Sequence, residues 1–112
     1  MKKMLIADDN KQITTILSGY AKKEGFEPVV ALDGAEALDK YLQYEHEIAV
    51  VLLDVMMPVM DGVEATIEIR KFDKRIPIVA LSANVVKHAQ EEFIHAGMND
   101  VVAKPIDIGH LL

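Results

Sequence analysis

A short apolar run that ends in one acid, VVLLD from Val50 to Asp54, constrains the fold of this chain most. Its β-branched start and its lack of polar breaks predict a strand buried on both faces, as in a parallel sheet. Pro58 delays the next helix, because the residue before a proline avoids the helical region. The strand predicted over Ile48 to Leu53 therefore delivers the carboxylate of Asp54 into a short loop.

Length and charge exclude several classes of protein. The chain has 112 residues, 51% of them hydrophobic, which predicts one globular domain over residues 1–112. The net charge is −6 and Lys and Arg form no stripe, so we expect no direct nucleic-acid binding. The apolar start, Met4 to Ala7, is too short for a signal core or a membrane span. The absence of cysteine suits a reducing compartment, and we expect a cytoplasmic protein without membrane contact.

Strand and helix patterns alternate five times along the chain. The predicted strands besides the central one are Met4–Ala7, Pro28–Ala31, Ile76–Leu81 and Val101–Ala103. Three predicted helices begin at the capping residues Asn10, Asp33 and Asp61, a fourth covers Val85 to Ala96, and a short fifth starts within Ile106 to Leu112. This alternation predicts an α/β fold with a parallel sheet and helices on both faces.

Apolar spacing predicts which helix residues face the core. In the first helix they are Ile13, Ile16, Leu17, Tyr20 and Ala21, in the second Ala35, Leu38, Tyr41 and Leu42, and in the fourth Val86, Ala89 and Phe93. Three methionines in the loop after the central strand are interpreted as apolar gap-fillers: Met56, Met57 and Met60.

Polar residues follow four of the five predicted strands. They are Asp8, Asp9, Asp54, Ser82 and Lys104. In parallel sheets the working site lies outside the carboxyl ends of the strands, and adjacent first and third strands would bring the three acids together. We expect Asp9 to be a buried, crowded acid that binds metal rather than supporting the fold.

This set of residues suits one chemistry. Three crowded carboxylates repel one another, and a divalent cation such as Mg²⁺ removes the repulsion. An ionised Asp54 needs no general base to act as a nucleophile. The cation, Lys104 and the Ser82 hydroxyl would relieve charge on a phosphoryl group. The pattern predicts phosphoryl transfer onto Asp54.

Four stretches resemble the receiver domains of bacterial two-component response regulators and hybrid histidine kinases. They are Leu5–Asn10, Leu53–Gly62, Pro77–Ala83, and Ala96–Asp100 continued by Ala103–Pro105. The resemblance covers nearly the whole chain. It implies a flavodoxin-like, doubly wound five-stranded sheet in the order 2-1-3-4-5, here with a short last helix.

The resemblance also implies roles for individual residues. Asp54 would be the phosphoacceptor, and Mg²⁺ would be held by Asp8, Asp9, Asp54 and the backbone carbonyl of Met56. Ser82 and Lys104 would contact the phosphoryl group, and the Lys104–Pro105 bond would be cis. Met56 and Asn84 would flank the path of the attacking water and tune the lifetime of the phosphate.

The resemblance also implies signalling partners, and the sequence differs from the family pattern at two places that bear on signalling. The phosphodonor would be a histidine kinase or a histidine phosphotransfer protein, and a homodimer would form through the fourth helix, fifth strand and last helix. Val101 stands where the family has an aromatic switch residue, and the last helix is short.

Two other functions stay open at this level. One is an interaction domain that keeps the fold without the chemistry. The other is a hydrolase with an aspartyl nucleophile, which the apolar Met56, two residues after Asp54, disfavours. A phosphoacceptor that acts only on its own carboxylate, and not as a turnover enzyme, is the interpretation we favour.

Overall fold

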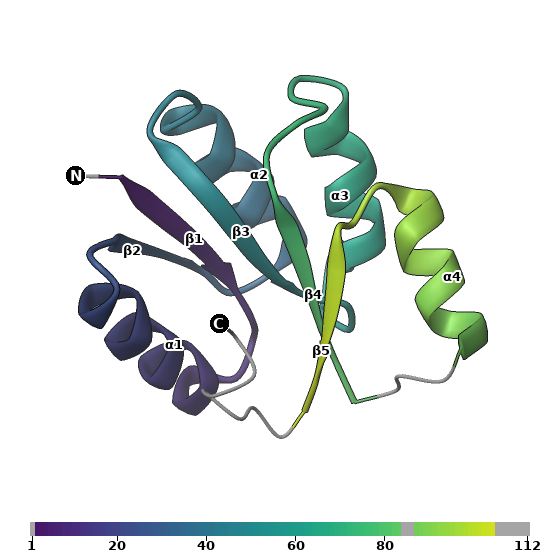
Figure 1. The fold of residues 1–112 in the computed structure, drawn as a ribbon, viewed down its shortest axis with the longest axis horizontal. Coiled ribbons are helices and arrows are strands. Elements are labelled where there is room, and N and C mark those ends of the chain that lie inside the picture. The colour runs from purple at the N-terminus through teal and green to yellow at the C-terminus, as the bar shows by residue number, and fades with distance from the viewer. Residues whose placement is uncertain (1, 84–86, 105–112) are drawn as a thin grey trace.

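In a computed structural model, which describes residues 2–83 and 87–104, five strands form one parallel sheet in the order β2-β1-β3-β4-β5 (Figure 1). The elements are β1 (Lys3–Ala7), α1 (Lys11–Lys23), β2 (Glu27–Ala31), α2 (Gly34–Gln43), β3 (Ile48–Asp54), α3 (Gly62–Arg70), β4 (Ile78–Ser82), α4 (Lys87–Ala96) and β5 (Asp100–Ala103). The predicted fold class and strand order are confirmed. The predicted last helix and the Lys104–Pro105 bond lie outside the described residues.

Strand residues point alternately to the two faces of the sheet and build two cores. Leu5, Val51 and Leu53 pack in one cluster with buried residues of α2, α3 and α4. Ile6 and Leu52, one position along, pack in a second cluster with buried residues of α1. Burial on both faces is what the unbroken apolar runs of the central strands predicted. No helix in the described ranges is long and apolar enough to cross a bilayer.

Three of the predicted helix starts, those of α1, α2 and α3, are confirmed by their caps. Asn10 Oδ1 accepts from the amide of Gln12 at 2.9 Å, Asp33 Oδ1 from that of Glu36 at 2.7 Å, and Asp61 Oδ1 from that of Glu64 at 2.9 Å. These side chains satisfy amides that have no partner inside the helix. Each of the three loops that leave β1, β2 and β3 thus ends at a defined residue.

Several sequence predictions about burial are wrong in detail. Ile16 is 51% exposed, and α2 buries Ala37 while Leu42 is exposed. Met56 is 78% exposed and fills no gap, whereas Met57 and Met60 pack against the core. Sequence periodicity locates the apolar stripe of a helix only to within about one residue. The element that packs against the helix decides which residues at the edge of that stripe are buried. Val85 and Val86 lie outside the described residues.

The start of β4 also differs from the prediction. The strand begins at Ile78 rather than Ile76, since Pro77 has no amide to contribute to the ladder. The Pro77 carbonyl still accepts from Val51 N at 2.9 Å, which sets the register of β4 on β3. That register decides which residues meet at the far edge of the sheet.

Candidate functional site

The register of the sheet brings the polar strand ends together. Ala7 pairs with Leu53, so Asp8 follows β1 beside Asp54, the last residue of β3. Ser82, the last residue of β4, pairs with Ala103 of β5, and Lys104 N donates to the Ser82 carbonyl at 2.9 Å. All the strand-end residues predicted from the sequence therefore lie along one edge.

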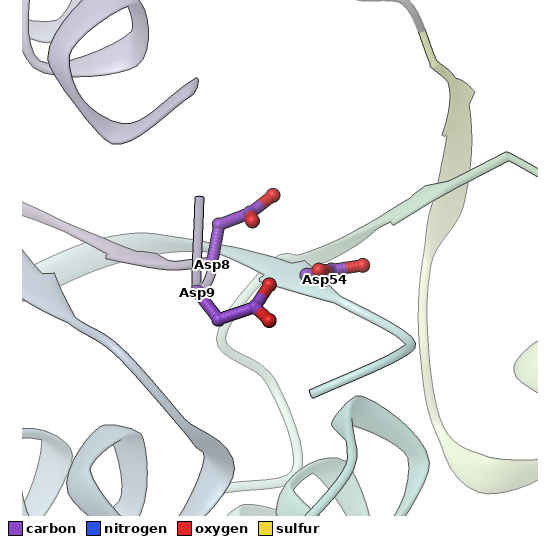
Figure 2. A group of neighbouring side chains, drawn as sticks. All are labelled: Asp8, Asp9 and Asp54. Atoms are coloured by element: carbon purple, nitrogen blue, oxygen red, sulfur yellow. The ribbon is translucent and has the colours of Figure 1, made fainter. Parts of the chain in front are cut away.

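Three carboxylates form a cluster at this edge. One oxygen from each of Asp8, Asp9 and Asp54 lies within 4.8 Å of the others, and Figure 2 shows Asp8 and Asp9 directed toward the side where Asp54 lies. Asp8 is fully buried and Asp54 is 3% exposed, but Asp9 is exposed. The expectation that Asp9 is a buried acid is wrong. The acid that follows β1 directly points inward, and its neighbour lies at the solvent side.

Lys104 contacts both buried acids. Its Nζ lies 2.9 Å from Asp8 Oδ2 and 3.2 Å from Asp54 Oδ2, and its side chain is 20% exposed. Burial alone would lower the pKa of Lys104, but its hydrogen bonds to Asp8 and Asp54, together with the charges of these acids, outweigh burial and raise this pKa. The ammonium is therefore positively charged at neutral pH and neutralises one of the three carboxylates.

The remaining oxygens show what the cluster lacks. Asp8 Oδ1 accepts from Asn10 N at 2.9 Å, and Asp54 Oδ1 accepts from Met56 N at 3.2 Å. Asp8 Oδ2 is buried, and its partner is the Lys104 ammonium at 2.9 Å. Three carboxylates whose oxygens lie within 4.8 Å of one another and that share one ammonium fit a hard divalent cation such as Mg²⁺, which takes oxygen ligands.

The environment raises the pKa of Asp54 to about 6. Burial is the largest cause and the neighbouring Asp8 charge comes next, while Lys104 and the Met56 amide act in the opposite direction. At pH 7 most molecules still carry an ionised Asp54. The site thus keeps a buried carboxylate in its nucleophilic form, at a cost in stability.

The loop after Asp54 is strained, which the sequence did not predict. Val59 has a φ of 68°, a left-handed conformation that β-branched residues rarely adopt. Met60 N donates to the Pro58 carbonyl at 2.7 Å and closes a γ-turn around Val59. Such strain costs on the order of 1–3 kcal/mol and persists only where the surroundings hold it. A glycine or asparagine at position 59 would have signalled this turn, but valine gives no such signal.

Gly62 holds the base of this loop. Its amide donates to the Val55 carbonyl at 2.9 Å, and a Cβ on Gly62 would lie 2.3 Å from the backbone oxygen of Asp54. From the sequence, Asp61 is expected only to cap a helix, and Gly62 carries no separate signal. The glycine also lets α3 begin directly against the residue that carries the central carboxylate.

The remaining site residues predicted from the sequence are Ser82, Val101, Met56 and Asn84, and three of them are described. Ser82 is buried at the carboxyl end of β4, and Val101 is half-buried against the larger core. Met56 points its side chain into solvent next to Asp54. Asn84 lies outside the described residues. The structure thus brings Asp8, Asp9, Asp54 and Lys104 together and places Ser82 on the same edge.

Comparison with protein families gives a match over nearly the whole chain. The family described as the response regulator receiver domain matches residues 4–112. Hybrid signal transduction histidine kinase I of Dictyostelium discoideum is 34% identical over 95% of this chain, and peroxide stress-activated histidine kinase mak1 of Schizosaccharomyces pombe is 34% identical over 96%. The chain spans only 6% and 7% of the lengths of these two proteins.

Solved structures share the fold. The CheX–CheY complex of Borrelia burgdorferi with BeF₃ and Mg superposes with a TM-score of 0.93 at 31% identity, over 98% of this chain and 83% of that chain. The Saccharomyces cerevisiae complex of the histidine phosphotransfer protein Ypd1 with the receiver domain of Ssk1 gives a TM-score of 0.87 at 28% identity, over 98% of this chain and 83% of that chain.

The raised pKa of Asp54 predicts a pH-dependent gain in stability for the metal-free Asp54→Asn variant. Since the folded pKa of about 6 exceeds an unfolded value of about 4, the penalty for the ionised form is absent below about pH 4, grows as pH rises toward 6 and is complete above it. We expect Asp54→Asn to be more stable than wild type by about 1–3 kcal/mol at pH 7.5, and the gain to vanish near pH 4.

Urea unfolding in EDTA at pH 4, 5, 6 and 7.5 measures this difference. Asp61→Asn is the matched control, because it replaces an acid of the same loop and keeps a side-chain oxygen to cap α3. A metal-free Asp54→Asn protein that is less stable than wild type at pH 7.5 contradicts the electrostatic account.

Proposed function

This chain belongs to the response regulator receiver domain family, and on that premise we propose that it accepts a phosphoryl group on Asp54 in a Mg²⁺-dependent phosphorelay step. The observation that carries this proposal is the position of the Lys104 ammonium, 2.9 Å from Asp8 and 3.2 Å from Asp54 at the carboxyl ends of the strands. A fold alone does not define a function, but this group of charges is suited to phosphoryl transfer.

Asp54 is the nucleophile in this proposal. One carboxylate oxygen attacks phosphorus and forms an O–P bond as the donor's bond to phosphorus breaks, and the electron pair leaves with the donor group. No general base is required because the carboxylate is ionised at neutral pH. The Met56 amide holds Oδ1 of Asp54 at 3.2 Å, which orients the carboxylate. The acceptor acts on itself, so the domain is a signalling module and not a turnover enzyme.

Asp8, Asp9, Asp54 and the backbone carbonyl of Met56 would hold the Mg²⁺ ion. When bound, Mg²⁺ supplies positive charge that neutralises the carboxylates and the phosphoryl oxygens. The clustered oxygens of the three acids support this ligand set. Because Asp9 is exposed, its carboxylate is accessible to an ion that enters the site from solvent.

Lys104 and Ser82 act on the phosphoryl oxygens. The Lys104 ammonium lies between the two buried acids. It can therefore form an ion pair with the phosphoryl oxygens once Asp54 is phosphorylated. Ser82 ends the adjacent strand, where a hydroxyl can donate to the same group. Both residues therefore favour the charge that develops during transfer.

The donor we propose is a histidine kinase or a histidine phosphotransfer protein. The named relatives are histidine kinases, and one structural relative is a receiver domain bound to a phosphotransfer protein. Residues 1–112 would form one receiver unit that works in the cytoplasm. A second copy would bind through the face of α4 and β5, where Ile94 is 52% exposed.

We expect Mg²⁺ and a small phosphodonor such as acetyl phosphate to add one phosphoryl group to the wild-type chain. Intact-mass spectrometry measures the addition. Asp54→Asn should abolish it, EDTA should abolish it, and Asp61→Asn should retain it, because Asp61 only caps a helix. A phosphoryl group that survives in Asp54→Asn or in EDTA overturns the assignment.

The exposed Met56 side chain should slow hydrolysis of the acyl phosphate, because it is apolar and lies two residues from Asp54. Replacing Met56 with Asn or Glu should speed dephosphorylation about fivefold, equivalent to roughly 1 kcal/mol of barrier, without preventing phosphorylation. Loss of the phosphate mass over time measures this rate. Ile67→Glu, which changes an exposed apolar side chain on α3, is the control. Unchanged rates in both Met56 variants contradict a tuning role.

Val101 should limit the conformational change on the α4–β5 face. Valine has one stiff χ1 and cannot sweep between two positions as a ring would. Val101→Tyr should fold with a stability change of about 1 kcal/mol and should show larger amide shifts in β5 on adding beryllofluoride and Mg²⁺. Equal shifts along β5 in wild type and variant, measured by NMR, would show that no ring is needed.

A further inference from the structure

Gly34, the first residue of α2, contacts the strained loop after Asp54 although α2 contributes no residue to the acidic cluster. Its amide donates to the Met60 carbonyl at 2.9 Å. A Cβ on Gly34 would lie 2.0 Å from that carbonyl oxygen, 2.7 Å from the carbonyl carbon and 3.0 Å from Met60 Cβ. The two backbones are therefore in direct contact, with no room for a side chain.

Space, not backbone conformation, requires glycine at this position. Among the described residues the glycines with positive φ are Gly25 and Gly97, and Gly34 is not one of them. Alanine would also suit the first turn of a helix better than glycine. Glycine here therefore runs against local helix propensity, and the contact with Met60 accounts for it.

This contact anchors the backbone of the loop from outside. The base is closed by Gly62 N to the Val55 carbonyl, and the γ-turn is closed inside the loop by Met60 N. Among the described residues, the backbone hydrogen bond that reaches residues 56–60 from outside the loop comes from Gly34. Met60 is the residue directly after strained Val59, so the anchor acts at the point where the turn would otherwise relax.

We propose that Gly34 is a positioning residue for the metal site, which it serves by holding the loop that carries the Met56 carbonyl. This inference rests on the proposed function, in which that carbonyl is a Mg²⁺ ligand. Because Cβ and Met60 oxygen must separate by more than about 1 Å before the contact is ordinary, alanine at position 34 displaces the loop. Residues that orient metal ligands without touching the metal commonly change affinity about tenfold or more.

The test compares Mg²⁺ affinity in wild type, Gly34→Ala and Gly19→Ala. Gly19 is the matched control, since it lies inside α1 and a Cβ there would meet nothing within 4 Å. Amide shifts of Asp9 and Asp54 during Mg²⁺ titration give the Kd of folded molecules, which a purely structural role would leave unchanged. We expect the Kd to rise about tenfold in Gly34→Ala and to stay unchanged in Gly19→Ala.

Hydrogen exchange in wild type keeps the proposal testable if Gly34→Ala does not fold. Coupling is reciprocal, so Mg²⁺ binding should increase protection of the Gly34 amide. The Met98 amide, bonded to the Phe93 carbonyl away from the site, should show a smaller change.

An unchanged Kd in folded Gly34→Ala overturns the positioning role and leaves the proposed function standing. If that variant is unfolded, the result that overturns the positioning role is hydrogen-exchange protection of the wild-type Gly34 amide that does not change when Mg²⁺ is added. A wild-type chain that binds no Mg²⁺ overturns the proposed function and the positioning role together.

Discussion

The repulsion among three carboxylates at one edge of the sheet is the constraint on which the rest of the site depends. Two of these acids are buried, and one ammonium, that of Lys104, lies between them. Buried charges are costly unless they are paired, and one cation cannot balance three anions. The parallel register of β1 on β3 prevents Asp8 and Asp54 from moving apart. The domain therefore holds an excess of negative charge at this edge, which a divalent cation would relieve.

The loop that follows Asp54 is held in a strained conformation next to the three acids. Val59 adopts a conformation that valine disfavours, and two glycines from different helices, Gly34 and Gly62, let backbones approach the loop closely. Strain of this kind is found where the surrounding structure over-determines a conformation. In the function proposed above, a loop that relaxed freely would move the Met56 carbonyl, an expected Mg²⁺ ligand, and the preorganisation for phosphoryl transfer would be lost.

Membership of the receiver family locates this chemistry within a larger class of proteins. The chain spans a small share of the hybrid kinases it resembles, and its fold is common to many receivers. Fold similarity alone does not establish that a member is phosphorylated. The charge arrangement around Asp54 supports the proposed activity here.

The sequence by itself determined the features that depend on a few neighbouring residues. Unbroken apolar runs specified buried parallel strands, the capping residues Asn10, Asp33 and Asp61 specified helix starts, and acids after strands specified the working edge. The tertiary structure alone decided that Asp8 is buried and Asp9 exposed, that Met56 faces solvent, and that Gly34 touches Met60. These outcomes depend on strand register and on loops that approach from distant parts of the chain, and no local pattern of side chains encodes such distances.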